Sequence, residues 1–472
     1  MTLSFVPRSL MTAGAAVLLA GCASTAIQDN FASAQAVAQD RLGAQVRWLT
    51  TPEARAQAEG DVDALLAKPL EADDAVRIAL AYSPAFQAML FDSAASSASI
   101  TQGARLPNPV FGFERLMRSQ AGISELEITR TFALSLYDLV LLPSRLRLAD
   151  SQQQQARWRL AGEIVQTATD ARQAWVRAVA AQQALQYAGQ VKTAADAAAE
   201  LARRMQAAGN FSKLQRAREQ AFAADAVAQL ARAQQRARST REALVRVVGL
   251  NDAQAGRLTL PDRLPELPKA PRDEQSVLVT AREQRLDVRL AQASLAVTAQ
   301  QQGLSRVTGF VNSLQVAAVN KGETGLAVQR GYALDVPLPL FDFGDATRAR
   351  AQATYMAALN RSAQVIVDAG SHVREAYDAY RTADDLARHY RDEIVPLRKT
   401  ISDENLLRYN GMLIGVFELL ADAREQIASV AQAIDAQQDF WLADAALTAA
   451  LIGRPSAAAM QGANVAERGA TE

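Results

Sequence analysis

The sequence predicts a mostly helical protein that contains two long helical hairpins and a few amphipathic strands. Three observations support this fold class: long proline-free stretches of good helix formers, short segments in which apolar and polar residues alternate, and a duplication of both patterns. The 472 residues are 49% hydrophobic and only 6% aromatic. Because Ala and Gln are abundant while Gly and Pro are scarce, the composition favours long, closely packed helices.

Two pairs of segments carry the duplication. Ala208–Gln220 aligns with Ile414–Gln426, with Gly, Phe, Leu, Ala, Arg, Glu and Gln at matching places. Arg130–Leu136 aligns with Arg330–Val336, with Arg, Ala and Leu in common. Since both matches occur in the same order at nearly the same spacing, we expect two copies of one structural unit.

A proline-rich segment separates the two copies. Four prolines within 258–272 exclude a helix there and favour extended backbone, so we predict a linker. The first repeat is then expected over 72–257 and the second over 273–453. An N-terminal segment, 22–71, precedes them, and a disordered tail is expected over 454–472.

Each repeat is predicted to run as helix, two strands, very long helix, sharp break and return helix. The first repeat has an expected helix over 73–104, ended by Pro107, and strands over about 110–116 and 123–136. Its long helix, 144–208, holds roughly 65 residues and would extend on the order of 95 Å. A helix of that length needs a partner along its side, so we expect coiled-coil hairpins. The return helices are predicted over 212–249 and 416–452.

The second repeat repeats this order with two irregularities. Its strands are expected over about 307–319 and 325–337, and its long helix over 345–409. Gly370 and Pro396 are positions at which that helix is expected to deviate from regular geometry. The expected apolar strand faces hold the following residues: Leu126, Ile128, Phe132, Leu134 and Leu136 in the first repeat, and Leu326, Val328, Tyr332, Leu334 and Val336 in the second. Arg130 and Arg330 interrupt these faces, which leaves open whether they lie near a membrane interface or the faces are assigned wrongly.

The N-terminus has the pattern of an export signal. Residues 1–21 hold a positive charge at Arg8 and a short apolar run, Ala13–Ala20, too short to span a bilayer as a helix. Leu19–Cys22 resembles a bacterial lipobox, and Cys22 is the one cysteine of the chain. This resemblance implies cleavage before Cys22, attachment of lipid such as palmitate to its sulfur, and the outer membrane. The alternative is an ordinary signal peptide beside an unrelated cysteine.

The strands raise the question of how they could enter a membrane. Beyond the signal, the sequence has no apolar run of 18 or more residues, so we expect no transmembrane helix. About four strands of about ten residues are long enough to cross a bilayer when tilted. Four strands cannot close a barrel, and open sheet edges are not tolerated in lipid, so we expect several chains to join.

This order of elements resembles the TolC-type outer-membrane factors of Gram-negative tripartite pumps. Four segments carry the resemblance, which covers about 72–453: Asp74–Pro84, Leu106–Pro109, Val336–Gly344, and Leu407–Gly411 with Glu418–Arg424. The first strand-to-helix exit, Leu136–Leu139, lacks the paired prolines of the second. The resemblance implies a homotrimer with a twelve-stranded β-barrel in the outer membrane of a Gram-negative bacterium, on a periplasmic α-helical tunnel. It further implies docking to a periplasmic adaptor and an inner-membrane pump, with passive conduction and no enzymatic step.

Candidate functional residues lie near the expected hairpin ends. Asp403 and Glu404 are candidates for an acidic gate or selectivity ring, and a solvated helix face is the alternative. Gly209 and Gly415 are aligned by the repeat where the helices reverse, and glycine tolerates the backbone angles of such turns. The candidate adaptor-docking residues are Arg204, Gly209, Asn210, Ser212, Arg408, Tyr409, Asn410, Gly411 and Gly415.

Several function classes are disfavoured by the sequence. Fifty basic and fifty acidic residues give no basic excess, which argues against nucleic-acid binding. His372 and His389 are the only histidines, and they are too far apart on one expected helix to share a metal, so we expect no metal site and no cofactor beyond the lipid on Cys22. No nucleophile elbow or phosphate loop is present. The alternatives that stay open are a coiled-coil structural lipoprotein without a pore and the exit duct of a type I secretion system.

Overall fold

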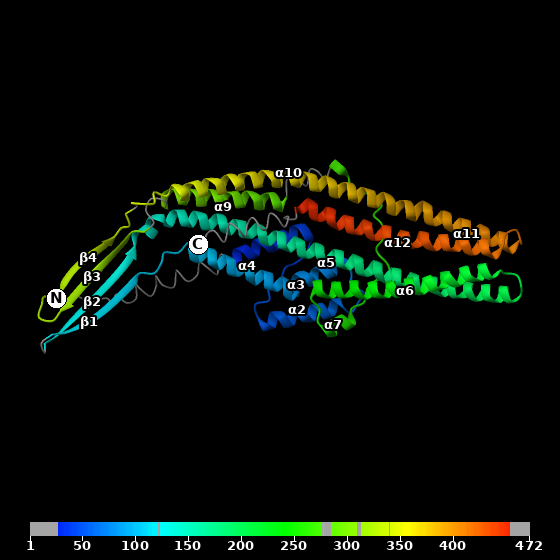
Figure 1. Ribbon diagram of the computed structural model, residues 1–472, viewed down its shortest axis with the longest axis horizontal. Coiled ribbons are helices and arrows are strands. Elements are labelled where there is room, and N and C mark those ends of the chain that lie inside the picture. Colours follow the sequence, from blue (N-terminus) through cyan, green and yellow to red (C-terminus); the bar gives the residue numbers. More distant parts are fainter. Residues whose placement is uncertain are drawn as a thin grey trace, which may run out of the picture.

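The computed structural model describes residues 27–120, 123–275, 277, 285–308, 313–338 and 340–453. The molecule is elongated, with a four-stranded sheet at one end and the turns of two helical hairpins at the other (Figure 1). The predicted signal, Cys22 and the predicted tail 454–472 lie outside the described residues. Within the described part, no helix is both long and apolar enough to cross a membrane.

The first half of the chain forms six helices and two strands in the described residues from Pro52 to Arg257. It runs α2 (Pro52–Leu65), α3 (Ala72–Ala81), α4 (Pro84–Gly103), β1 (Val110–Gln120), β2 (Ile123–Ser135), α5 (Leu136–Ala207), α6 (Lys213–Val248) and α7 (Asp252–Arg257). The single helix expected over 73–104 is wrong: it is two helices. Pro84 disfavours helical geometry in the residue before it, and Ser83 accordingly has φ −53° and ψ 123°.

The second half repeats this order. It runs α9 (Leu286–Thr308), β3 (Gln315–Glu323), β4 (Gln329–Asp335), α10 (Asp345–His389), the π-helical turn η1 (Tyr390–Ile394), α11 (Val395–Asn410) and α12 (Val416–Ile452). The bounds of the strand expected over 307–319 are wrong, whereas the strand expected over about 325–337 contains the shorter β4. The helical period of α9 continues through Thr308, and the residues between β3 and β4 form a turn with Gly325 at φ 83°.

The two long helices differ in how they accommodate proline. α5 begins eight residues earlier than the expected 144, because the Ser135 hydroxyl caps it by accepting from the Asp138 N–H at 3.2 Å, and it continues through Pro143. In the second half, η1 ends at Ile394, two residues before Pro396. Proline removes a helical N–H and clashes with the carbonyl four residues earlier, and a π-turn relieves that conflict. Gly370, the other expected irregularity, lies within α10 without a break.

The duplication extends to two closely packed glycines that end the return helices. Gly249 follows α6 with φ 82°, and Gly453 follows α12 with φ 83°. A Cβ on Gly249 would lie 2.8 Å from Ser83 Cα, and one on Gly453 would lie 2.8 Å from the Leu286 backbone nitrogen. Each cap therefore packs against the start of the corresponding shorter helix, α4 or α9.

The main hydrophobic cores surround the middle of α5 and of the α10–α12 pair. Trp175 of α5 is buried among α3, α6 and the proline-rich segment, and its indole N–H donates to the Leu70 carbonyl at 2.6 Å. In the second half, Tyr380 and Phe440 are fully buried with ring centroids 5.6 Å apart. The Arg272 N–H donates to the Tyr380 hydroxyl at 3.1 Å, which ties the end of the proline-rich segment to α10.

Candidate functional site

The sheet joins the two halves and has two chemically different faces. Its strand order is β1-β2-β3-β4, all antiparallel, so the contact between the repeats is the β2–β3 pair. Phe132 pairs with Ala318, which pairs with Tyr332, and Leu134 aligns with Val316 and Leu334 in the same way. Paired residues in adjacent strands share a face. The predicted apolar positions that lie within β2 and β4 therefore share one face. Outside the strands are Leu136, which begins α5, Leu326 and Val328, which precede β4, and Val336, which follows it.

The opposite face is polar, and β1 and β4 are the edges of this sheet. Glu127 and Lys321 form an ion pair at 2.7 Å on the polar face, and Arg118 and Glu125 lie 3.9 Å apart there. On the apolar face Phe111, Phe132 and Tyr332 are more than half exposed in this single chain. A sheet with one apolar face, one polar face and two free edges is suited to forming a wall between lipid and water together with further copies.

An exposed apolar segment follows β4 where the sheet meets α10. Phe341 is 98% exposed, and Leu338 and Leu340 are also mostly exposed. This segment adds exposed apolar surface between the sheet and α10. Large exposed apolar surfaces of this kind mark contact with a membrane or with another protein.

The two hairpin turns lie together at the end of the molecule opposite the sheet (Figure 1). Val416 at the start of α12 packs with Phe211 of the first turn and Ala202 of α5. The first turn is closed by a capping box, in which the Gln215 N–H donates to the Ser212 hydroxyl at 3.2 Å and the Ser212 N–H donates to the Gln215 side chain at 2.8 Å. The turns of the two repeats are thus brought to one surface.

The predicted turn glycines do not behave alike. Gly209 has φ 80°, as expected for a helix reversal. Gly411 and Gly415 have φ −81° and −82°, so the expectation that Gly415 supplies the unusual backbone angle is wrong. Met412 adopts the left-handed conformation instead, with φ 58°, and its side chain is 93% exposed. Leu413 is 74% exposed, so the second turn presents an apolar tip.

The predicted polar docking residues surround these turns. Arg204 is 73% exposed and forms an ion pair with Glu200 at 2.7 Å, while Arg203 contacts the same carboxylate. These two guanidinium groups lower the pKa of Glu200 to about 2. Asn210 donates its backbone N–H to the Met205 carbonyl at 2.8 Å. The second turn adds three exposed residues: Arg408, Tyr409 and Asn410.

The two acidic gate candidates differ in their local partners. Asp403 forms an ion pair with Lys399 at 2.6 Å on the same face of α11, and both side chains are more than 60% exposed. Glu404 is also exposed, and no residue in the described ranges forms an ion pair with it. Glu404 therefore carries the less compensated negative charge of the two.

Sequence reasoning missed the contacts that hold the two hairpins together. Arg424 of α12 forms an ion pair with Glu219 of α6, which is fully buried, and lies 5.1 Å from the centroid of the Phe222 ring. Arg218 of α6 lies 5.6 Å from the centroid of the Phe417 ring of α12. The sequence did contain a signal for these contacts, because an Arg-Glu pair stands at the same position in both repeats.

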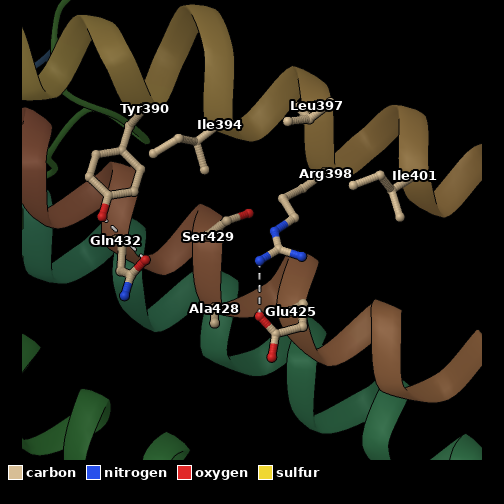
Figure 2. A pocket seen from close by; sticks show the side chains of 9 residues that line it. All are labelled: Tyr390, Ile394, Leu397, Arg398, Ile401, Glu425, Ala428, Ser429 and Gln432. Atoms are coloured by element: carbon tan, nitrogen blue, oxygen red, sulfur yellow. Dashed lines mark hydrogen bonds and ion pairs between the residues drawn. The ribbon is translucent and has the colours of Figure 1, made fainter. Parts of the chain in front are cut away.

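A shallow groove lies beside these contacts, between α12 and the helix that contains η1. It has a volume of about 420 Å³, and Figure 2 shows its lining side chains. The Tyr390 hydroxyl donates to the Gln432 side chain at 3.3 Å, and Arg398 forms an ion pair with Glu425 at 3.1 Å. The described residues contain no group of three or more His, Cys, Asp or Glu that could hold a metal ion.

Solved structures with this architecture are known. A membrane protein from Pseudomonas aeruginosa has a TM-score of 0.68 at 19% identity over 80% of this chain and 93% of its own. The outer membrane protein VceC from Vibrio cholerae has 0.67 at 16% identity over 81% and 96%. The CmeC outer membrane channel of Campylobacter jejuni has 0.69 at 12% identity over 84% and 89%.

The chain has the fold of a TolC-like outer-membrane factor. The fold resemblance predicted from the sequence is thereby confirmed across most of the chain. No protein-family model and no curated protein matches the sequence. Of these relatives, CmeC is described as an outer membrane channel, and at 12% to 19% identity the likeness shows the fold alone.

Proposed function

We propose that the chain is one protomer of a trimeric outer-membrane exit duct in a tripartite efflux system. The observation that carries this proposal is the sheet: four strands with one apolar face, one polar face and two unpaired edges. Three copies joined edge to edge would give twelve strands with the apolar face toward lipid and the polar face toward the lumen. Likeness to outer membrane channels supports the same arrangement.

In this proposal the helical hairpins form a periplasmic tunnel that conducts substrates passively, with no bond broken. The turns at the far end dock a periplasmic adaptor linked to an inner-membrane pump. Met412 and Leu413 would supply apolar contact, and the exposed Arg204, Arg408 and Tyr409 would supply polar contact around it. Aromatic and arginine side chains beside an apolar centre are typical of protein interfaces.

The gate is proposed at the same end. The ion pair between Glu219 and Arg424 joins α6 to α12 and would hold the two hairpins together. Asp403 and Glu404, repeated in three protomers, would form an acidic ring that favours cations. Cys22 would carry the lipid anchor, which adds membrane affinity without contributing to the pore.

Single-channel conductance in planar bilayers tests the proposal. The purified protein should be a stable trimer and should give discrete conductance steps. A monomer that dissociates from membranes and gives no steps would contradict the channel and favour a lipid-anchored coiled-coil spacer. A Cys22→Ser variant should lose incorporation of labelled palmitate while keeping its conductance, because the sheet and not the lipid forms the pore.

A further inference from the structure

Three arginines gather on the apolar face of the sheet. Arg130 of β2 pairs with Asn320 of β3, which pairs with Arg330 of β4. The side chains of these two arginines and of Asn320 therefore lie in one row on one face. Arg115 of β1 pairs with Ile128, two residues from Arg130, and therefore lies on the same face one step nearer the β1–β2 turn. All three arginines are exposed.

This face offers the arginines no carboxylate. By strand alternation, every acidic residue of the four strands lies on the opposite face, where Lys321 and Arg118 are the nearby cations. These acidic residues are Glu114, Glu125, Glu127, Glu323 and Asp335. Within the described strands, the apolar face therefore carries three positive charges and no negative charge. A negative partner for the arginines must come from outside the sheet.

The arginine row interrupts the apolar face, because Ile128, Leu126 and Met117 lie on the same face on the side of the β1–β2 turn. On its helix side lie two rows of apolar residues, Phe132 with Tyr332 and Leu134 with Leu334, followed by the exposed segment that includes Phe341. Arg130 lies five residues before the end of β2, or roughly 13 Å above the first helical turn for a strand that rises about 3.3 Å per residue and is tilted about 40°. Arg330 is the second residue of β4, next to the β3–β4 turn.

An arginine close to the lipid headgroups, as Arg330 beside the β3–β4 turn would be, is far better tolerated than one at the centre of the hydrocarbon. Its cost in a transmembrane sheet falls to nearly nothing close to the headgroups, and its long stem lets the guanidinium reach them. The planar guanidinium donates two parallel hydrogen bonds to a phosphate. Asn320, between Arg130 and Arg330, adds an amide donor to the same row.

We propose that Arg130, Arg330 and Arg115 form a binding site for the phosphate group of an anionic lipid in the outer leaflet. This inference rests on the proposed membrane channel, because only insertion of the sheet brings its apolar face to lipid. The row would repeat around the trimer and hold the barrel at a fixed depth. The lipid, and not free phosphate, is the ligand, since the apolar rows below the arginines would contact its acyl chains.

Native mass spectrometry of the detergent-purified trimer, titrated with dioctanoyl phosphatidic acid, tests the site. One cation near an anionic lipid surface contributes about fivefold in affinity, so the Arg130→Gln/Arg330→Gln double variant should bind roughly 25-fold more weakly. The matched control is Arg118→Gln/Lys321→Gln, which removes two charges from the opposite face. It should bind within about twofold of the wild type. Arg330→Lys, which keeps the charge and loses the fork, should be intermediate.

Three results would overturn the site. The first is equal binding by the wild type and the double variant, and the second is equal binding of dioctanoyl phosphatidylcholine and phosphatidic acid. The third is displacement of the lipid by inorganic phosphate at comparable concentration. Conductance recorded on the same preparations separates the two proposals. If the double variant forms normal pores and binds the lipid as the wild type does, only the proposed lipid site is wrong. If the wild type forms neither trimers nor pores, the proposed channel is wrong.

Discussion

Arg424 of α12 and Glu219 of α6 form an ion pair between residues 205 positions apart, and the glutamate is fully buried. Each belongs to an Arg-Glu pair that the duplication placed in both halves. In the second half, the corresponding glutamate, Glu425, instead contacts Arg398 within its own hairpin and is 62% exposed. Equivalent residues therefore join the two hairpins in one case and stay within one hairpin in the other.

Removing Arg424 should destabilise the protein and loosen the hairpins. An Arg424→Met variant leaves the Glu219 charge buried without compensation, which costs about 3 kcal/mol or more of the free energy of unfolding. The measurement is the urea midpoint of the trimer, combined with its open probability in planar bilayers, which should rise. Arg398→Met breaks the exposed pair and is the control, with an expected loss below about 1 kcal/mol. Equal effects of the two variants would show that burial of Glu219 does not matter.

The two helix-ending glycines should be intolerant of a side chain. Gly249→Ala and Gly453→Ala combine a left-handed backbone with a Cβ that would approach backbone atoms within 2.8 Å. Each should cost at least about 1 kcal/mol in the free energy of unfolding, because an L-residue is disfavoured in that conformation by about this amount before any clash. Gly189, inside α5 with open space around it, is the control: Gly189→Ala should be stabilising by up to about 1 kcal/mol. Urea midpoints of the three variants would decide it, and a neutral Gly453→Ala would contradict the proposed packing.

Asp444 should make stability depend on pH. Burial raises the pKa of its carboxyl, opposed by the nearby Arg272, which forms an ion pair with it at 2.7 Å. A raised folded-state pKa means that the group favours folding most when protonated, and this contribution is lost as pH rises through the folded pKa. Asp444→Asn should therefore gain stability relative to wild type as pH increases from about 4 to 7. Thermal midpoints of both proteins across that range test it, and a difference between them that does not change with pH would contradict the prediction.

Much of the fold was predictable because its signals are local. The helical period, the alternation in β2 and the prolines each act over a few residues, and the return helices α6 and α12 lie within a residue or two of their expected bounds. What failed depended on neighbours in space. The start of β3 is set by its pairing with β2. The break at Ser83 is different, because Pro84 is a local signal that the sequence interpretation overlooked.

The candidate site was less predictable than the fold, because its important contacts join residues far apart in sequence. The pairing of Arg130 with Asn320, and of Asn320 with Arg330, became visible only once the register was known. Likewise, the pattern that suggested Gly415 as the turn residue could not show that Met412 takes the unusual backbone angle. Asp403 and Glu404 were equivalent in the sequence, and the structure distinguishes them by the ion pair that Asp403 makes with Lys399.

This difference predicts unequal effects on ion selectivity. Lys399 compensates Asp403 locally, so an acidic ring at this level would owe most of its field to Glu404. Glu404→Gln should lower the cation-to-anion permeability ratio more than Asp403→Asn, and Lys399→Gln should raise it by releasing the Asp403 charge. Reversal potentials in a salt gradient across planar bilayers give the ratio directly. All three variants should have the unfolding midpoint of the wild type, because the side chains are exposed. A larger effect of Asp403→Asn, or no effect of Lys399→Gln, would place the selective charge elsewhere along the tunnel.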